Sequence, residues 1–111
     1  MSEHDVIIVG GSAMGSAAAY YLGLIDPTLS VAVVERDPTY QFSSTMRSEG
    51  NLRTQFNLEE NIRMSLFTFG LLETFAADMA VDGWRPDPAP RRQGNLFLVD
   101  EANADAAAEG M

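Results

Sequence analysis

The chain has 111 residues and a mass of 12.1 kDa, which is enough for one modest domain. Seven basic residues, all arginine, stand against 16 acidic ones, and the formal net charge of −9 argues against a nucleic-acid-binding surface. The absence of cysteine excludes disulfides, thiolate metal sites and a cysteine nucleophile, and a single histidine leaves little for a histidine metal site or a Ser-His-Asp triad, so we expect no metal.

The N-terminal residues predict no targeting signal. A secretory signal needs a basic start before an apolar stretch, whereas the polar residues 2–5 lead straight into an apolar run at 6–9. No apolar run approaches the ~20 residues that span a bilayer. We therefore expect a cytoplasmic protein without a membrane span.

The first forty residues predict one βαβ unit. Residues 5–10 form a short, β-branched apolar run ending in glycine, which is typical of a parallel strand buried on both faces. A small-residue turn at 11–15 precedes an Ala- and Leu-rich helix at 16–24, which Asp26-Pro27 ends. A second β-branched strand follows at 30–35, and the crossover between the two strands should be right-handed.

A long polar segment and a long helix come next. Residues 36–56 show no clean periodicity, and a polar loop of this length is uncommon unless it binds something. Apolar residues at three- and four-residue spacing then predict a helix over 58–79, with Asn57 and Glu60 resembling a capping box. We interpret the apolar stripe as core packing. In a truncated chain the same stripe would be exposed and would favour self-association.

The last residues predict a connector and the start of another layer. Residues 83–93 are rich in proline, 94–100 favour a third strand, and 101–109 favour a helix that has only begun. The predicted parts are therefore a binding portion at 1–82, a connector at 83–93 and the start of a substrate domain at 94–111. A doubly wound sheet usually has about five or six strands, so we expect a piece of a larger protein. The alternative is a short natural chain completed by a partner or by oligomerisation.

The glycine-rich turn carries the clearest functional signal. Gly10-Gly11-Ser12-Ala13-Met14-Gly15 lies between strand and helix, where a dinucleotide-binding G-x-G-x-x-G belongs. Gly10 permits the tight turn, and Gly15 allows the helix to pack on the strand. The helix N-terminus offers N–H groups and a positive dipole end to a pyrophosphate. Ser12 replaces the second glycine, and its hydroxyl could hydrogen-bond phosphate.

Glu35 ends the second strand, 20 residues after Gly15, where an acid binds the ribose hydroxyls of adenosine. The alternative is a glycine-rich turn without a ligand and a solvated Glu35. A GxxxxGK[ST] phosphate loop needs lysine, which is absent, and a G-x-S-x-G nucleophile elbow needs glycine where Met14 stands. The predicted fold class is therefore α/β, an incomplete Rossmann-like FAD- or NAD(P)-binding domain with a βαβ unit and a long helix.

Three segments carry a resemblance to a known family. DVIIVGGSAMGSAAAYYL, VAVVER and SSTMRSEGNLRTQF resemble the FAD-dependent oxidoreductases of the D-amino-acid oxidase, glycine oxidase and sarcosine oxidase group. The third segment discriminates, because the family has a serine-containing stretch, a glycine pair and then an arginine. This chain matches at Ser44, Gly50 and Arg53, while Asn51 replaces the second glycine. The resemblance is good over residues 5 to about 75 and looser at 94–98.

The resemblance implies a role in FAD binding for each matching position. The turn from Gly10 to Gly15 would hold the pyrophosphate, Glu35 the adenosine ribose, and Arg36 would flank the adenosine. Further along, the residues implied to contact pyrophosphate or ribityl oxygens are Ser43, Ser44 and Thr45, and those implied to lie near the flavin ring are Gly50, Asn51, Leu52 and Arg53.

The resemblance also implies an activity. Family members oxidise the C–N bond of an amino acid or a secondary amine by hydride transfer to the flavin, so a small amine substrate is expected. No catalytic residue is identified, although Arg53 is a candidate near the flavin, and the chain alone is expected to be inactive. Two alternatives stay open: an NAD-dependent dehydrogenase unit, and a truncated, non-catalytic chain completed by a partner.

Overall fold

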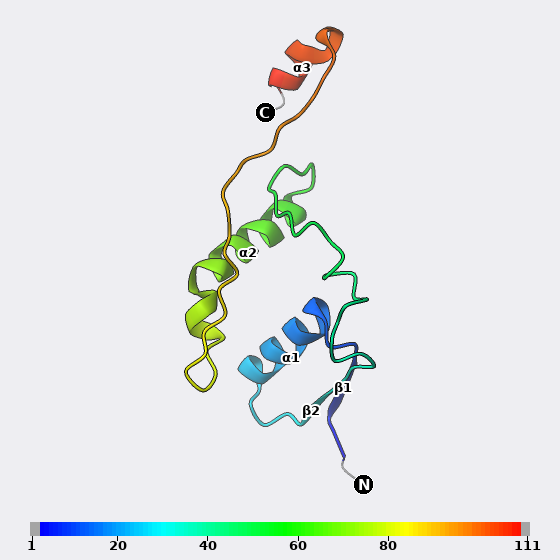
Figure 1. The fold of residues 1–111 in the computed structure, drawn as a ribbon, viewed down its shortest axis with the longest axis vertical. Coiled ribbons are helices and arrows are strands. Elements are labelled where there is room, and N and C mark those ends of the chain that lie inside the picture. The colour runs from blue at the N-terminus through cyan, green and yellow to red at the C-terminus, as the bar shows by residue number, and fades with distance from the viewer. Residues whose placement is uncertain (1–2, 110–111) are drawn as a thin grey trace. The chain divides into compact units, whose positions relative to one another are not determined.

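The computed structural model describes residues 3–109. The chain falls into two compact units, Met1–Asn51 and Leu52–Met111, which we call unit 1 and unit 2. Figure 1 shows the elements in chain order. Unit 1 contains the strands β1 and β2 and the helix α1, and unit 2 contains the helices α2, η1 and α3.

Unit 1 is a βαβ unit, as the sequence predicted. β1 (Val6–Val9) and β2 (Val31–Val34) pair in parallel from Val6↔Val31 to Val9↔Val34, and α1 (Ala13–Ile25) connects them. α1 lies along one face of this two-stranded sheet (Figure 1). Beyond the strands, the Gly10 N–H donates to the Val34 carbonyl at 2.8 Å, so the parallel pairing continues into the glycine-rich turn.

α1 begins three residues earlier than the sequence predicted. The Ser16 N–H bonds the Ser12 carbonyl at 2.9 Å, which makes Ser12 the N-cap and places Ala13–Gly15 inside the helix. The predicted end is confirmed, because Asp26 is the C-cap. The Asp26 carboxylate accepts hydrogen bonds from the Thr28 hydroxyl at 2.6 Å and the Thr28 N–H at 3.0 Å, and these two bonds lower the pKa of Asp26.

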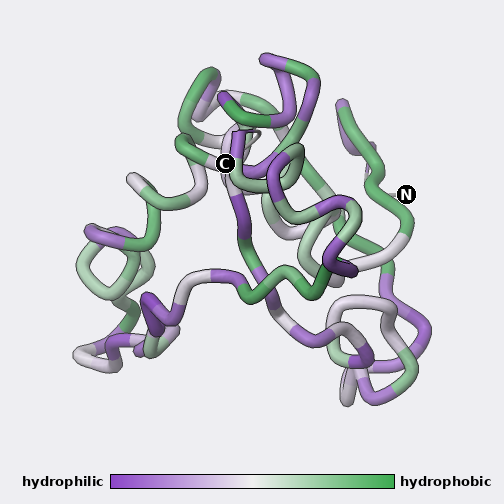
Figure 2. The backbone as a smooth tube through the Cα atoms, turned by 90° about the horizontal axis from the view of Figure 1, so that it is seen from above, coloured by the Kyte–Doolittle hydropathy of each residue, from purple (hydrophilic) through white to green (hydrophobic). Residues whose placement is uncertain are grey.

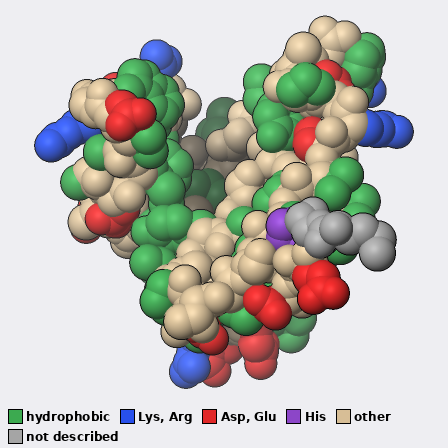
Figure 3. Space-filling view, turned by 90° about the horizontal axis from the view of Figure 1, so that it is seen from below, with side chains coloured by type: hydrophobic (Ala, Val, Ile, Leu, Met, Phe, Trp, Pro, Cys, Tyr) green, Lys and Arg blue, Asp and Glu red, His purple; other side chains and the backbone are tan. Residues whose placement is uncertain are grey.

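The sheet is covered on one face only, although the sequence predicted that its first strand is buried on both faces. Along β1 the side chains alternate between half-buried and exposed, and Ile7 and Val9 are 62% and 87% exposed. The hydrophobic stretch of β1 is visible near the N-terminus in Figure 2. α1 covers one face, and no other helix or strand of unit 1 packs on the sheet among the described residues. Hydrophobic side chains accordingly reach the surface in Figure 3.

In unit 2 the predicted long helix is present as α2 (Glu59–Asp78). The predicted capping box is wrong: the N-cap is Leu58, and no side chain caps the first turn. Instead, Glu59 and Glu60 place negative charge at the positive end of the helix dipole, and Glu59 pairs with Arg63 at 2.6 Å. No residue of α2 is buried, so the packing partner expected for its apolar stripe stays a prediction.

The predicted strand at 94–100 is also wrong. After a tight turn at Val81–Trp84, where Asp82 and Gly83 have φ angles of 50° and 82°, residues 85–100 form no regular structure. Leu96 and Leu98 are 86% and 88% exposed. A strand needs a neighbour to satisfy its N–H and C=O groups, and no described segment pairs with this one.

The helix predicted after residue 100 is confirmed. It consists of a 3₁₀ turn, η1 (Glu101–Asn103), followed by α3 (Ala104–Glu109). Asp100 caps it, because its carboxylate accepts from the Asn103 N–H at 3.0 Å and from the Asn103 side-chain amide at 2.6 Å.

Candidate dinucleotide-binding site

The turn between β1 and α1 depends on glycine at two positions for two different reasons. Gly10 has a φ of 100°, a left-handed conformation that an L side chain rarely adopts. Gly15 lies in the first turn of α1, where an added Cβ would stand 1.8 Å from the Gly10 carbonyl oxygen. The helix therefore approaches the end of β1 more closely than any other residue would permit. Both roles that the sequence predicted for these glycines agree with this geometry.

Gly11 is the most enclosed position of the turn. It is the one buried residue in the described range 3–109, and a Cβ there would come 2.9 Å from the Tyr40 hydroxyl and 3.3 Å from a Val33 methyl. Its N–H donates to Glu35 Oε2 at 2.8 Å. The carbonyl of Gly11 accepts from the Ser16 hydroxyl at 2.5 Å. These contacts tie the turn to the end of β2 and to α1.

Glu35 links the glycine turn to the loop that follows β2. Its second carboxylate oxygen, Oε1, accepts from the Asp37 N–H at 2.9 Å. The hydrogen bonds from the Asp37 and Gly11 N–H groups hold the pKa of Glu35 below its ordinary value, and partial burial opposes them. The carboxylate is therefore ionised at neutral pH. Because an ionised carboxylate accepts about four hydrogen bonds, it has acceptor capacity for the hydroxyls of a ribose.

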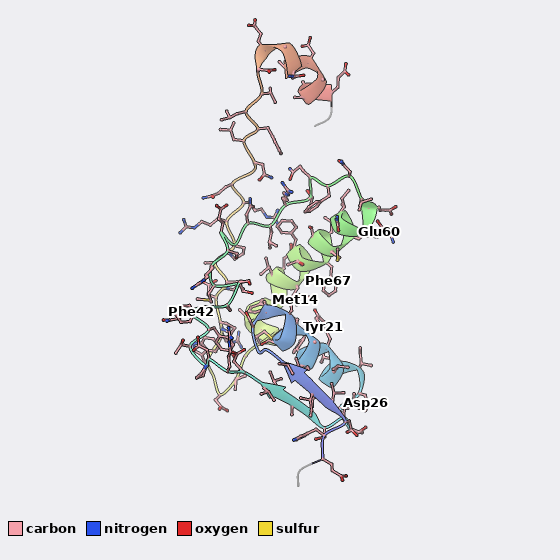
Figure 4. All side chains as sticks on the ribbon, turned by 90° about the vertical axis from the view of Figure 1, so that its right-hand side faces the viewer. Met14, Tyr21, Asp26, Phe42, Glu60 and Phe67 are labelled. Carbon is pink, nitrogen blue, oxygen red and sulfur yellow. The ribbon has the colours of Figure 1, made fainter. Side chains whose placement is uncertain are left out.

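The N-terminus of α1 has the features of an anion-binding site. Its first N–H groups have no partner within the helix, and Ser12 provides no side-chain cap. The first turn itself contains no acidic residue that would occupy the positive end of the dipole. Met14, at the start of α1 in Figure 4, is 86% exposed. A diphosphate fits this end of the helix.

One of the three predicted phosphate-contacting residues of the polar loop forms a hydrogen bond with the glycine turn. The Ser12 hydroxyl donates to Thr45 Oγ1 at 3.2 Å. Ser43 instead caps a local turn, its Oγ accepting from the Met46 N–H at 3.2 Å. Ser44 is exposed beside them. Arg36 lines a separate pocket of about 540 Å³ together with Asp37, Thr39, Gln41 and Phe42.

The residues predicted to lie near a flavin ring straddle the boundary between the units. Gly50, with a φ of 65°, and Asn51 end unit 1, whereas Leu52 and Arg53 begin unit 2. The Arg53 guanidinium lies 4.9 Å from the centre of the Phe56 ring. A pocket of about 230 Å³ is lined by Leu52 and Phe56 together with Asn61, Met64, Ser65 and Thr68 of α2. The predicted place of these four residues at the flavin stays a prediction.

The structure adds two residues that the sequence reasoning missed. Asp37 supplies an N–H to Glu35, and its own carboxylate accepts from the Thr39 hydroxyl and N–H at 2.6 and 3.0 Å, contacts that lower the pKa of Asp37. The Asp-Pro-Thr sequence was a signal for such a turn. Tyr40 places its hydroxyl over Gly11 from a backbone with a φ of 57°, and no sequence pattern indicated this.

The described part of the chain contains neither a metal-ligand cluster nor a membrane-spanning helix. No group of three or more His, Cys, Asp or Glu residues gathers as a metal site would require between residues 3 and 109. Over the same residues, no helix has the length and apolarity that crossing a membrane requires.

Comparison with known proteins identifies the family. Residues 5–110 match the family described as FAD dependent oxidoreductase, DAO. The chain belongs to this family. It is 43% identical over 104 residues to FAD-dependent oxidoreductase domain-containing protein 1 of Xenopus laevis, covering 90% of this chain and 21% of that protein. It is 48% identical over 107 residues to the Drosophila melanogaster homolog, covering 92% and 19%. No solved structure matches the chain.

Membership decides between the cofactors that the sequence reasoning left open. The family and its relatives are named for FAD, so the cofactor is FAD rather than a nicotinamide, and the predicted resemblance is confirmed. The family implies a Rossmann-like fold, of which the βαβ unit and its two-stranded parallel sheet are a part. The chain spans about a fifth of the length of the relatives it matches.

Proposed function

We propose that this chain supplies the FAD-binding portion of a flavin-dependent oxidoreductase that oxidises the C–N bond of an amino acid or a secondary amine. One observation carries the binding part of the proposal. The glycine turn, the open N-terminus of α1 and the ionised Glu35 carboxylate are held together by the 2.8 Å hydrogen bond between the Gly11 N–H and Glu35. An anion site and a hydroxyl-binding carboxylate therefore stand side by side, as a nucleotide diphosphate requires.

Different residues are proposed to bind different parts of FAD. The first N–H groups of α1 would bind the diphosphate, and Glu35 would bind the adenosine ribose, with Arg36 flanking the adenosine. Ser43, Ser44 and Thr45 would contact diphosphate or ribityl oxygens from the loop. The residues that would lie along the flavin ring are Gly50, Asn51, Leu52 and Arg53.

When bound, FAD supplies the hydride acceptor for oxidation of the carbon that bears the substrate amine. The chain's own residues bind and orient it. Gly10 and Gly15 let the backbone take the shape that exposes the helix N-terminus, and Glu35 fixes the turn to β2. We assign no catalytic residue here, and Arg53 is the candidate that stands in the segment proposed to face the flavin.

FAD binding is tested by titrating the chain with FAD and following flavin fluorescence. We expect saturable binding that Glu35→Ala abolishes, because the ribose loses its acceptor and Gly11 loses its partner. Glu73→Ala is the matched control, since Glu73 is an exposed glutamate of unit 2 whose side chain lies 3.6 Å from Arg92. Equal affinity of the wild type and Glu35→Ala would contradict the assignment of Glu35.

The proposed substrate class needs the longer protein loaded with FAD. Under anaerobic conditions, amino acids and secondary amines should bleach the visible flavin absorbance, whereas the corresponding hydroxy acids should not. Bleaching by hydroxy acids alone would refute C–N oxidation while leaving the FAD assignment intact.

A further inference from the structure

The serine that replaces the second fingerprint glycine contacts the polar loop. Ser12 Oγ donates a hydrogen bond to Thr45 Oγ1 at 3.2 Å, across 33 positions of the sequence and within unit 1. A serine at the N-cap of a helix usually accepts a bond from an N–H of the first turn, but this one makes no such cap. The Ser12 hydroxyl therefore bonds to the loop, and the first N–H groups of α1 receive no bond from it.

The backbone around Thr45 holds it in place. The Thr45 carbonyl accepts from both the N–H and the hydroxyl of Ser48, at 3.2 and 2.8 Å. The preceding turn is closed by the Ser43 N–H, which donates to the Tyr40 carbonyl at 2.8 Å. The Thr45 hydroxyl therefore stands beside the glycine turn because of the fold of the loop, and the contact with Ser12 is an additional link.

The hydroxyl pair has one donor to spare. The hydroxyls of Ser12 and Thr45 carry two protons and share one hydrogen bond, so one O–H proton stays available for another acceptor, whichever hydroxyl donates within the pair. A hydroxyl that accepts one hydrogen bond becomes a better donor in the next. An ionised diphosphate has acceptors only, and it is the ligand that such a pair, next to the positive end of a helix, is suited to bind.

We propose that Ser12 and Thr45 act together as one hydroxyl pair that binds the FAD diphosphate in place of the missing fingerprint glycine. The inference rests on the proposed function. Ser12 has φ −70° and ψ −170°, an extended backbone that any residue adopts, so the position does not demand glycine. In the usual fingerprint that glycine lets the backbone approach the diphosphate. Here a side-chain contact takes its place and couples the 36–56 loop to the turn.

Whether Ser12→Gly weakens or strengthens FAD binding tests the proposal directly. Ser12→Gly restores the fingerprint glycine, and it should weaken FAD binding about tenfold, as expected for a lost hydrogen bond to a charged group. If Ser12 were only an obstacle to backbone approach, the same change would strengthen binding, and that result overturns the proposal.

Coupling between the two residues is tested by a double-mutant cycle in FAD titrations. Ser12→Ala removes the hydroxyl without disturbing a cap, and Thr45→Val removes the other hydroxyl at nearly constant shape. We expect each single variant to lose about tenfold in affinity and the double variant to lose little more, because one pair is broken in all three. Thr45→Ser, which keeps a hydroxyl, should bind as the wild type does. Fully additive losses overturn the pair.

Competition with ADP and with adenosine separates phosphate binding from folding. The variants should lose the same factor for ADP as for FAD and nothing for adenosine, which has no phosphate and so reports on an intact fold. An equal loss for adenosine would show a structural role and overturn the proposal. If the wild type binds FAD and all variants bind it equally, the pair is refuted and the proposed function stands. If the wild type binds no FAD, both are refuted.

Discussion

The closest backbone approach in unit 1 gives its sharpest prediction. In Gly15→Ala, the new Cβ would stand 1.8 Å from the Gly10 carbonyl oxygen, 3.0 Å from the Gly10 carbonyl carbon and 3.2 Å from an Ile8 methyl. Real Cβ contacts essentially never fall under 3.0 Å, so α1 and the end of β1 must separate by about 1.2 Å. The obstacle is backbone, which cannot rotate away as the end of a side chain can.

The magnitude follows from two opposing effects. Overpacking costs about 1–3 kcal/mol, and a backbone obstacle places this case near the upper end. Alanine in place of glycine inside a helix recovers about 1 kcal/mol. We therefore expect Gly15→Ala to lower the free energy of unfolding by about 2 kcal/mol.

The same helix contains the matched control. Gly23 also lies in α1, and a Cβ there would have nothing within 4 Å. Gly23→Ala should therefore raise the free energy of unfolding by about 0.5–1 kcal/mol. Urea denaturation followed by far-ultraviolet circular dichroism measures both variants against the wild type. Two alanine variants that shift the urea midpoint in the same direction would refute the reasoning about the turn.

Three other expectations concern charge, association and the last segment. The folded-state pKa of Glu35 lies below its unfolded value, so the ionised carboxylate stabilises the fold above the unfolded pKa and loses this effect as pH falls through the folded pKa. In urea denaturation, the difference in the free energy of unfolding between the wild type and Glu35→Gln should therefore vanish over that acid range. If the stripe of α2 drives self-association, Leu66→Glu should reduce the concentration dependence of sedimentation, and an unchanged profile would contradict this. In hydrogen exchange the amides of residues 95–99 should exchange much faster than those of β1, whereas equal protection would restore the predicted strand.

The parts of the fold that could be predicted from the sequence are those fixed by nearby residues. The turn needs glycine where Gly10 takes a left-handed φ, and Glu35, the acid proposed to bind the ribose, directly follows the end of β2. Asp26 ends α1 through bonds to a residue two positions away. Each of these features depends on short-range geometry, so the sequence pattern and the structure agree.

The predictions from sequence that were wrong or missing concern two kinds of feature. One kind depends on partners far away in the sequence, and the other on a choice between two nearby residues that are equally suitable. The β-branched residues of 94–100 favour a strand, but a strand exists only beside another strand, and none pairs with this segment among residues 3–109. Either Ser12 or Ser16 could be the N-cap of a helix. In the structure the Ser16 N–H donates to the Ser12 carbonyl, so the helix begins after Ser12. The contact between Ser12 and Thr45 joins residues 33 positions apart, and the sequence around neither residue indicates it.

Folding and cofactor binding share contacts in unit 1. The hydrogen bond from the Gly11 N–H to Glu35 stabilises the empty turn, and the same carboxylate is proposed to receive the ribose. Glu35 is half-buried while its unit has no buried hydrophobic side chain among the residues described, so its polar contacts matter more here than they would above a large core. A ligand that binds only the folded turn adds its binding free energy to the stability of that turn. FAD is therefore expected to act as part of the structure of unit 1 as well as its cofactor, with Glu35 as the residue through which the two roles are joined.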